Sequence, residues 1–424
     1  MKETQEKLNK KIMKQKKFRR KNEIGITLIA LVVTIVILLI LSGVTINMLL
    51  GENGIIRTAQ EAKNTWEDAI TNEQEEIQNL VNELNNIMNE EGGSGGEEPE
   101  DPNKGPNGKP LVETATEIQT ESNLEAEDEY GNPVVVPKGF KVVVDETTNN
   151  ATTVPEGIVI EDGAGNQFVW IPTGTYKVDA SGTTKTNDLT RRQWGTTANT
   201  VQEPTTITGD EVVSGNSGQY YYGEGATQDK DGNSITPVST KIEEFLNSAK
   251  AVTEGGNGGF YIGRYEQGEG NVCKAGVNTY VNVTRDTAKT QAEAMYTDKE
   301  QYGVTSELIS SYAWDTALNF ICQNSEHGYT LATTTEDTYG NIGTNNKTQT
   351  GGYPADCYSN IYDFLGNCTE WTTEYSSSTS SSGAYPCVLR GGNCYYSDSY
   401  AAIRNNSAAD GSGTTLSFRL SLYV

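Results

Sequence analysis

The chain has 424 residues, a formal net charge of −25 and a single histidine, His327. One histidine excludes a metal site built from several histidines, and a Ser-His-Asp triad would depend on His327 alone. Ten of the 32 basic residues lie in residues 1–21, so the rest of the chain is strongly acidic, repels phosphate backbones and predicts no nucleic-acid partner.

The N-terminal segment predicts a membrane anchor. Residues 1–23 form a basic leader, and residues 24–51 contain no charged side chain and are mostly aliphatic. About 20 apolar residues cross a bilayer as a helix, so this run is long enough. Basic residues favour the cytoplasmic side, so we expect a single-pass protein of the cell membrane whose C-terminal domain is extracytoplasmic.

The start of this anchor resembles the type IV pilin signal. The stretch "GITLIA" follows the basic leader and is similar to the family pattern G-F-T-L-I-E. The resemblance implies cleavage after Gly25, which would make Ile26 the new N-terminus. Ala30 stands where the family has a glutamate that helps assembly, so the resemblance does not extend to polymerisation. An uncleaved anchor is the alternative, and self-association through the N-terminal helix stays open.

The next segments predict a stalk and a linker. Within residues 52–91, apolar residues follow one heptad frame that Lys63 and Glu73 interrupt, which indicates a stalk helix or a short coiled coil. Residues 92–129 contain "GGSGGEEPEDPNKGPNGKP" and predict a flexible acidic Gly/Pro linker. The head domain is then predicted over residues 130–424.

The head combines short strands with one clear helix. The runs "GNPVVVPKGFKVVV", "GIVIEDGAGNQFVWIP" and "GGFYIGRYE" each contain a β-like core bounded by turn residues. The stretch 305–324 carries an apolar stripe that includes Leu308 and Trp314, and it predicts a helix. Phe418, Leu420 and Leu422 alternate and predict one closing core strand. The head is therefore predicted as an α+β domain.

Four stretches of the head, in order, resemble the formylglycine-generating (sulfatase-modifying factor) enzyme family. They are "NQFVWIP", "FYIGRYE", "SNIYDFLGNCTEW" and "VLRGGN" followed by "LSFRL". The resemblance covers most of residues 130–424. It implies a C-type-lectin-like head on the transmembrane and stalk helix, a fold in which long loops carry the function.

The resemblance does not imply that this chain performs the family's reaction. That oxidation needs Cu(I) held by two cysteine thiolates, which are soft ligands. Alignment on the glycines of "RGGN" places Tyr396 and Ala401 at the two positions, and Cys394 is the one cysteine of that segment. We therefore expect no enzyme activity, with a formylglycine-generating-type oxidase as the alternative.

The resemblance also implies a structural Ca²⁺ at the turn "DFLGNCTEW". Its ligands would be the side chains of Asp363 and Glu370 and the main-chain oxygens of Gly366 and Cys368. Two carboxylates on one loop suit this hard cation on chemical grounds. The alternative is that Asp363 caps a turn and Glu370 pairs with an arginine such as Arg390.

The six cysteines show no C-x-x-C spacing, which argues against a zinc or thioredoxin-like site. An extracytoplasmic head permits disulfides, and free buried thiols are the alternative. Four of the cysteines lie within residues 357–394, where three pairings are possible.

The stretch 393–415 is rich in Tyr, Asn, Ser, Asp and Gly, a composition that suits recognition loops, although these residues also favour loops in general. It predicts a surface-exposed display protein that binds an unknown extracellular ligand or protein. The candidate ligand-binding residues are Asn393, Tyr395, Tyr396, Ser397, Asp398, Tyr400, Asn405, Asn406 and Asp410.

Most residue types in this stretch can be reached by changing adenines in an Asn codon. Target proteins of diversity-generating retroelements vary in this way, resemble the same family in fold, and keep their variable residues just before a C-terminal Phe-Arg. Here Phe418 and Arg419 follow the stretch. The resemblance implies genetic diversification of residues 393–415.

Overall fold

The computed structural model describes residues 101–424, except 211–212, 215–218, 237–238, 240 and 381–382. The predicted leader, anchor, stalk and the first part of the linker lie outside the described residues, as does the signal at Gly25 and Ile26. Of the helices that the structure describes, none combines the length and the apolar character that a membrane crossing requires.

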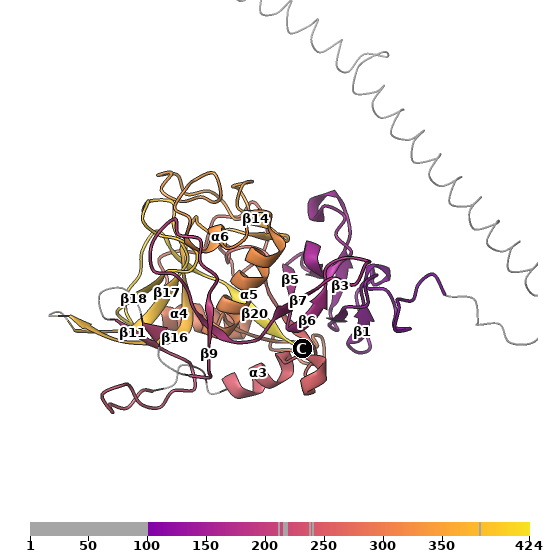
Figure 1. Cartoon of the computed structure of the whole chain (residues 1–424), viewed down its shortest axis with the longest axis horizontal. Helices are drawn as coiled ribbons and strands as arrows, with labels where there is room; N and C mark the ends of the chain where they lie inside the picture. Colours follow the sequence, from indigo (N-terminus) through magenta and orange to yellow (C-terminus); the bar gives the residue numbers. More distant parts are fainter. Residues whose placement is uncertain (1–100, 211–212, 215–218, 237–238, 240, 381–382) are drawn as a thin grey trace, which may run out of the picture. The chain divides into compact units, whose positions relative to one another are not determined.

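Among the regular elements of the described chain, β-strands predominate and helices are few (Figure 1). A six-stranded antiparallel sheet has the order β13-β20-β12-β5-β4-β3. Its strands are β3 (Phe140–Val143), β4 (Val159–Asp162), β5 (Gln167–Pro172), β12 (Gly259–Gly263), β13 (Thr305–Leu308) and β20 (Leu420–Tyr423).

A second six-stranded sheet has the order β10-β11-β16-β17-β18, and β19 pairs with β16 in parallel. Its strands are β10 (Val213–Ser214), β11 (Tyr220–Tyr222), β16 (Thr369–Ser380), β17 (Gly383–Arg390), β18 (Arg404–Ser407) and β19 (Leu416–Phe418).

Four two-stranded ribbons and four helices complete the regular structure that is described. The ribbons are β1 (Leu124–Glu127) with β2 (Pro133–Val136), β6 (Gly174–Lys177) with β7 (Thr184–Asn187), β8 (Arg191–Gln193) with β9 (Thr205–Ile207), and β14 (Cys357–Tyr358) with β15 (Ile361–Tyr362). The helices are α3 (Ile242–Ala249), α4 (Arg285–Ala294), α5 (Ser311–Asn324) and α6 (Thr330–Thr333). Single 3₁₀ turns lie at Val112–Thr114, Glu146–Thr148, Val154–Glu156 and Val252–Glu254.

Helix α5 links the two large sheets. It contacts β5 of the first sheet and β16 of the second, and twelve of its residues are buried. Trp314 on α5 is fully buried and stacks on Phe364 at a ring-centroid distance of 4.2 Å. One hydrophobic core therefore includes residues from both sheets and from α5.

The predicted strands at the start of the head are confirmed as β2 to β5, and "GGFYIGRYE" contains β12. The prediction of one helix over residues 305–324 is wrong at its start. Residues 305–308 form β13, where Leu308 pairs with Leu420, and α5 begins after Ser310, whose hydroxyl accepts a hydrogen bond from the Ala313 N–H. A short apolar run fits a buried strand as well as a helix, so periodicity alone did not separate them.

The prediction of one closing strand is also wrong. Phe418 lies in β19 beside Trp371 of the second sheet, whereas Leu420 and Leu422 lie in β20 of the first sheet. Arg419 stands between the two strands and is fully buried. The chain end therefore joins both sheets, and it is buried on both faces.

The packed head begins earlier than residue 130. Val112, Ala115 and Ala126 all lie in the hydrophobic core, and β1 pairs with β2. The described part of the predicted linker thus contains a few well-spaced apolar residues that are sufficient to anchor it. Because most residues of this segment are polar, its composition did not indicate that these apolar residues join the core.

Candidate functional site

The C-terminal loop leaves β17 through Gly391 and Gly392. Gly391 has a φ of +84°, which favours glycine. A Cβ atom at Gly392 would lie 2.5 Å from the Leu365 carbonyl oxygen, closer than any stable contact. The two glycines therefore let the backbone turn tightly against the core before the loop begins.

The loop then forms a turn that projects residues 395–398, here called the loop tip. The Asn393 Oδ1 atom accepts hydrogen bonds from the N–H groups of Tyr395 and Tyr396 at 2.9 and 3.1 Å. The Ser399 hydroxyl closes the turn by donating to the Tyr396 carbonyl at 3.0 Å. The turn is thus held by its own polar residues, which leaves the tip side chains available.

The loop tip is exposed. The exposed fractions of Tyr395 and Tyr396 are 45% and 62%. Ser397 and Asp398 are exposed beside them. Elsewhere in the described residues, Val201 and Val252 are the other large hydrophobic side chains that are this exposed. A pair of adjacent exposed tyrosines is therefore specific to this loop within the part of the chain that is described.

The other predicted ligand-binding residues are divided between the surface and the interior. Asn405 and Asp410 are exposed, and Asn406 is half-buried. Asn393 and Tyr400 are buried, with exposed fractions of 5% and 4%. The expectation that Tyr400 is an exposed anchor is wrong, because its side chain packs in the hydrophobic core.

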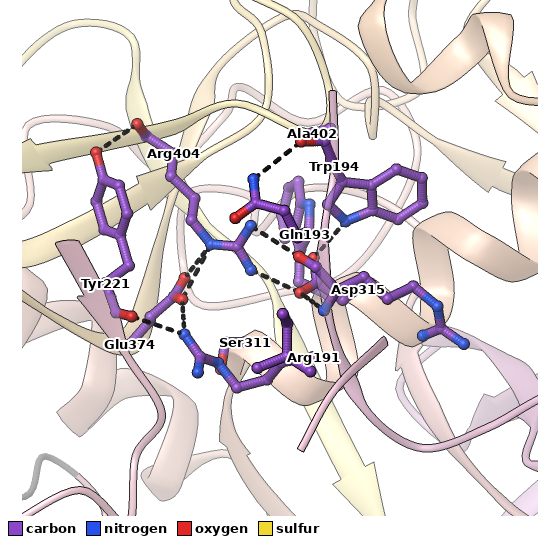
Figure 2. A network of polar contacts seen from close by, with 12 residues as sticks. Arg191, Gln193, Trp194, Tyr221, Ser311, Asp315, Glu374, Ala402 and Arg404 are labelled. Carbon is purple, nitrogen blue, oxygen red and sulfur yellow. Dashed lines mark hydrogen bonds and ion pairs between the residues drawn. The ribbon is translucent and has the colours of Figure 1, made fainter. Parts of the chain in front are cut away.

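A buried ionic network, here called the arginine frame, joins the second sheet to β8 and α5. It consists of Arg191, Arg390, Arg404, Asp315 and Glu374. Figure 2 shows Arg191, Arg404, Asp315 and Glu374. Arg404, the first residue of β18 after the loop, binds Asp315 at 2.6 Å and Glu374 at 3.0 Å. Arg390 binds Asp315 at 2.7 Å, and Arg191 binds Glu374 at 2.7 Å. Three guanidiniums therefore share two carboxylates, and they fix both ends of the loop to the core.

Asp315 is the central acceptor of the arginine frame. It also accepts hydrogen bonds from the Trp194 indole and the Arg192 N–H at 2.8 and 2.7 Å. Burial by itself would raise the pKa of Asp315, but Arg390 and Arg404 hold that pKa well below its usual range. Asp315 therefore stays ionised at every ordinary pH.

Sequence reasoning did not find the arginine frame. One signal was present, because Asp315 stands directly after Trp314 on the apolar helix α5. A carboxylate in an apolar helix requires a partner, since an unpaired buried charge is very costly. The identity of its partners was not readable, because Arg390 and Arg404 lie 75 and 89 residues away in the sequence.

A second buried cluster surrounds the "DFLGNCTEW" turn and is here called the acidic turn. It contains Glu266, Asp356, Asp363 and Glu370, with Arg419 as the cation that pairs with Glu370. Asp363 has a φ of +58° and accepts a hydrogen bond from the Gly351 N–H at 2.7 Å. Glu266 accepts from the Cys368 N–H at 2.7 Å.

The two carboxylates of the predicted calcium site have different partners. Glu370 forms a buried ion pair with Arg419, at 2.8 Å from one of its guanidinium nitrogens. The partner is thus Arg419, and Arg390 belongs to the arginine frame. The Asp363 Oδ1 atom and the Asp356 Oδ2 atom are buried and accept no hydrogen bond of normal geometry within the described residues.

The acidic turn contains four carboxyl groups and one guanidinium. Burial raises the pKa of Asp356 to about 8, with Asp363 as the next cause, and burial raises the pKa of Asp363 to about 6. Burial also raises the pKa of Glu370, which Arg419 opposes. Burial thus disfavours the ionised carboxyls, and if all four were ionised their charge would exceed what Arg419 neutralises.

A hard cation fits part of this site. The Asp363 Oδ1 atom, which accepts no hydrogen bond within the described residues, is an oxygen donor of the kind that Ca²⁺ prefers. Glu370 would have to share its oxygens with Arg419. In the described residues, no group of three or more His, Cys, Asp or Glu side chains is arranged to hold a metal on side chains alone.

The positions that align with the family's copper thiolates hold no sulfur. Tyr396 is exposed on the loop tip, and Ala401 is fully buried. All six cysteines are free thiols in this structure. The aligned positions therefore provide no copper ligands.

These features define a mainly β domain whose C-terminal loop presents an exposed polar and aromatic tip on a buried ionic base. No family model matches the chain, and no curated protein matches it. Among solved structures, the chain is similar to PvdO from Pseudomonas aeruginosa at 13% identity and a TM-score of 0.36, over 63% of this chain and 98% of that one. It is similar to variable protein 1 of Treponema denticola at 12% identity and a TM-score of 0.26, over 61% of this chain and 96% of that one. At these values neither likeness assigns a site or an activity.

Proposed function

We propose that the chain is a surface display protein. An N-terminal anchor in the cell membrane would hold a C-type-lectin-like head of the formylglycine-generating type outside the cell. The loop tip, together with Asn405, Asn406 and Asp410, would bind an extracellular ligand or protein. The observation that carries the proposal is the pair Tyr395 and Tyr396, exposed on a turn whose base is buried and ion-paired.

The physical argument concerns the separation of binding from folding. Tyrosines supply rigid amphipathic contact area at low entropic cost, and Ser and Asp supply adaptable hydrogen bonds. The arginine frame and Asn393 hold the backbone, so the tip side chains contribute little to stability. A surface of this kind can change its residues without unfolding the domain.

An oxidase of the formylglycine-generating type is the other candidate function. It would need two thiolates that reach one Cu(I) ion at the loop. The aligned positions Tyr396 and Ala401 supply none, so display explains the loop better.

The proposal includes diversification of the loop by a retroelement. The structure-based expectation is that varied codons fall on exposed positions such as Tyr395, Tyr396 and Asp398. Arg404 should stay constant, because no other side chain can bridge Asp315 and Glu374. Sequencing the gene across many strains, together with a search of the neighbouring genome for a reverse transcriptase and an adenine-rich template repeat, would test this. Variation spread equally over Arg404 and the tip would contradict it.

The proposal also includes a structural Ca²⁺ at the acidic turn. Asp363 and the main-chain oxygens of Gly366 and Cys368 would hold it, with Glu370 shared between the cation and Arg419. The ion would offset the excess negative charge of the turn. It would stabilise the head and would take no part in a reaction.

Binding can be tested with matched variants of the full chain. Glycan and protein arrays would first identify binders of the wild-type protein. The double variant Tyr395→Ser/Tyr396→Ser should lose these binders, because the aromatic contact area is removed. The control Val201→Ser/Val252→Ser removes comparably exposed side chains outside the loop and should keep them. Binders retained by the tyrosine variant would contradict the proposed surface.

A further inference from the structure

Two cysteines from distant parts of the sequence lie in hydrogen-bonded segments. The Cys394 N–H donates to the Asn367 carbonyl, the residue before Cys368, at 3.1 Å. The Asn393 side-chain amide donates to the hydroxyl of Thr369, the residue after Cys368, at 3.0 Å. Cys394 and the residue before it are therefore bonded to the two residues that flank Cys368.

These bonds limit the distance between the two cysteines. The path from the Cys394 Cα atom through the hydrogen bond to the Cys368 Cα atom has a contour of about 8.6 Å, and the direct separation is shorter because the path bends at each atom. Disulfides join Cα atoms that are usually about 4.4–6.8 Å apart. The backbone spacing therefore suits a disulfide.

The side chains of the two cysteines are also enclosed. Both residues are buried, with exposed fractions of 1% for Cys368 and 0% for Cys394. A disulfide between them would therefore lie in the protein interior.

The other four cysteines lie in different surroundings. Cys387 on β17 pairs with Tyr375 and Ser407 on its neighbouring strands, and Cys357 pairs with Tyr362. The Cys273 thiol donates to the Gln167 carbonyl at 3.1 Å, and Cys322 is buried on α5. The spacing argument therefore selects one of the pairings that the sequence left open.

We propose that Cys368 and Cys394 form a disulfide under oxidising conditions. The bond would covalently link the base of the loop tip to the acidic turn. This inference is independent of the proposed ligand binding, because it concerns the backbone that supports the loop tip and not the side chains of the tip.

The oxidant would be a small-molecule or protein disulfide. One cysteine thiolate attacks a sulfur of the oxidant, which breaks the oxidant's S–S bond and forms a mixed disulfide. The second thiolate then displaces the remaining oxidant thiolate. In balance, two thiols lose two protons and two electrons, and glutathione disulfide becomes two glutathione thiols. Both sulfurs are buried, so the bond should form during folding rather than in the finished domain.

The test is to refold the full chain in mild detergent, once with reduced and oxidised glutathione and once with dithiothreitol. Free thiols are alkylated after denaturation, and peptide mass spectrometry locates the protected cysteines. Protection of Cys368 and Cys394 in one linked peptide, with the other four of the six cysteines alkylated, is the expected result. Reduction should lower the melting temperature by roughly 4 °C.

The variants separate this pair from other pairings. Cys368→Ser and Cys394→Ser should each abolish the linked peptide, whereas Cys357→Ser should keep it. The wild-type mapping stands even if a variant fails to fold. Alkylation of all six cysteines in correctly folded oxidised protein, or a linked peptide that joins other cysteines, would overturn the proposal.

Discussion

The arginine frame and the acidic turn are two buried charge clusters that each include a glutamate of β16. They differ in how many of their carboxylates have a cationic partner. Glu374 and Glu370 lie four residues apart on β16. In the arginine frame, three guanidiniums surround two carboxylates, and every carboxylate has an arginine partner. In the acidic turn, four carboxylates lie near one guanidinium, and two carboxylate oxygens have no hydrogen-bond partner in the described residues.

The difference indicates different roles. The carboxylates of the arginine frame all have arginine partners, so this cluster needs no added cation, and it fixes the geometry of the loop that it holds. A cluster with excess buried negative charge is destabilising unless protons or a cation are bound. Variants that change the charge of each cluster should therefore have opposite effects.

The largest expected effect is in the arginine frame. Asp315→Asn should destabilise the protein by about 3–5 kcal/mol, because Arg390 and Arg404 lose their shared counter-charge in a buried place. Chemical denaturation of the full chain measures this change. Asp398→Asn makes the same chemical change at the exposed tip and should alter stability by less than about 0.5 kcal/mol. Equal effects of the two variants would show that the arginine frame does not support the fold.

The acidic turn should respond to calcium. A cation that binds only the folded state at a hundredfold excess over its Kd stabilises by about 2.7 kcal/mol. The melting temperature of the wild-type chain should rise between EDTA and millimolar Ca²⁺, and Asp363→Asn should remove most of the rise. Asp315→Asn should lower the starting value but keep the rise. Identical melting curves with and without Ca²⁺ in the wild type would exclude the site.

The two clusters should also differ in their response to pH. In EDTA, a carboxyl whose pKa is raised in the folded state contributes stability at low pH, and the contribution is lost as pH rises through the folded pKa. For Asp356, with a pKa of about 8, stability should fall between pH 5 and pH 8. Asp356→Asn should remove on the order of 2 kcal/mol of this decline.

Asp315 of the arginine frame provides the matching control for this pH dependence. The pKa of Asp315 is lowered in the folded state, so its contribution is present above its unfolded pKa and is lost only in strong acid. Stability curves measured from pH 5 to pH 8 should therefore keep the same slope in Asp315→Asn. A flat curve for the wild type in EDTA would contradict the excess of charge in the acidic turn.

The smallest expected effect is at the loop tip. Tyr395→Ser and Tyr396→Ser should each change the free energy of unfolding by less than about 0.5 kcal/mol, because both side chains are exposed. Tyr400→Ser should cost several-fold more, because its side chain is buried in the core. Thermal melts of the three variants compare tip and base within one loop. A large loss of stability from Tyr396→Ser would show that the tip side chains support the fold, which contradicts the prediction.

The sequence by itself determined the local features of this protein. Turn residues that bound short β-branched runs predicted β2 to β5 and β12, because these preferences act within a few residues. The composition of residues 393–415 predicted a loop surface, which holds for the exposed residues Tyr395, Tyr396, Ser397 and Asp398, whereas residues 404–407 form β18. The "RGGN" and "DFLGNCTEW" motifs marked the two segments that form the base of that loop.

Only the tertiary structure decided which polar residues are buried and which partners they have. Arg404 and Tyr400 have the same local surroundings as the exposed tip, yet they are inside, because Asp315, Glu374 and the core lie beneath them. Glu370 pairs with Arg419 and not with Arg390, and Leu308 lies in a strand because it pairs with Leu420 near the end of the chain. Such contacts join residues dozens of positions apart, and local preference carries no information about them.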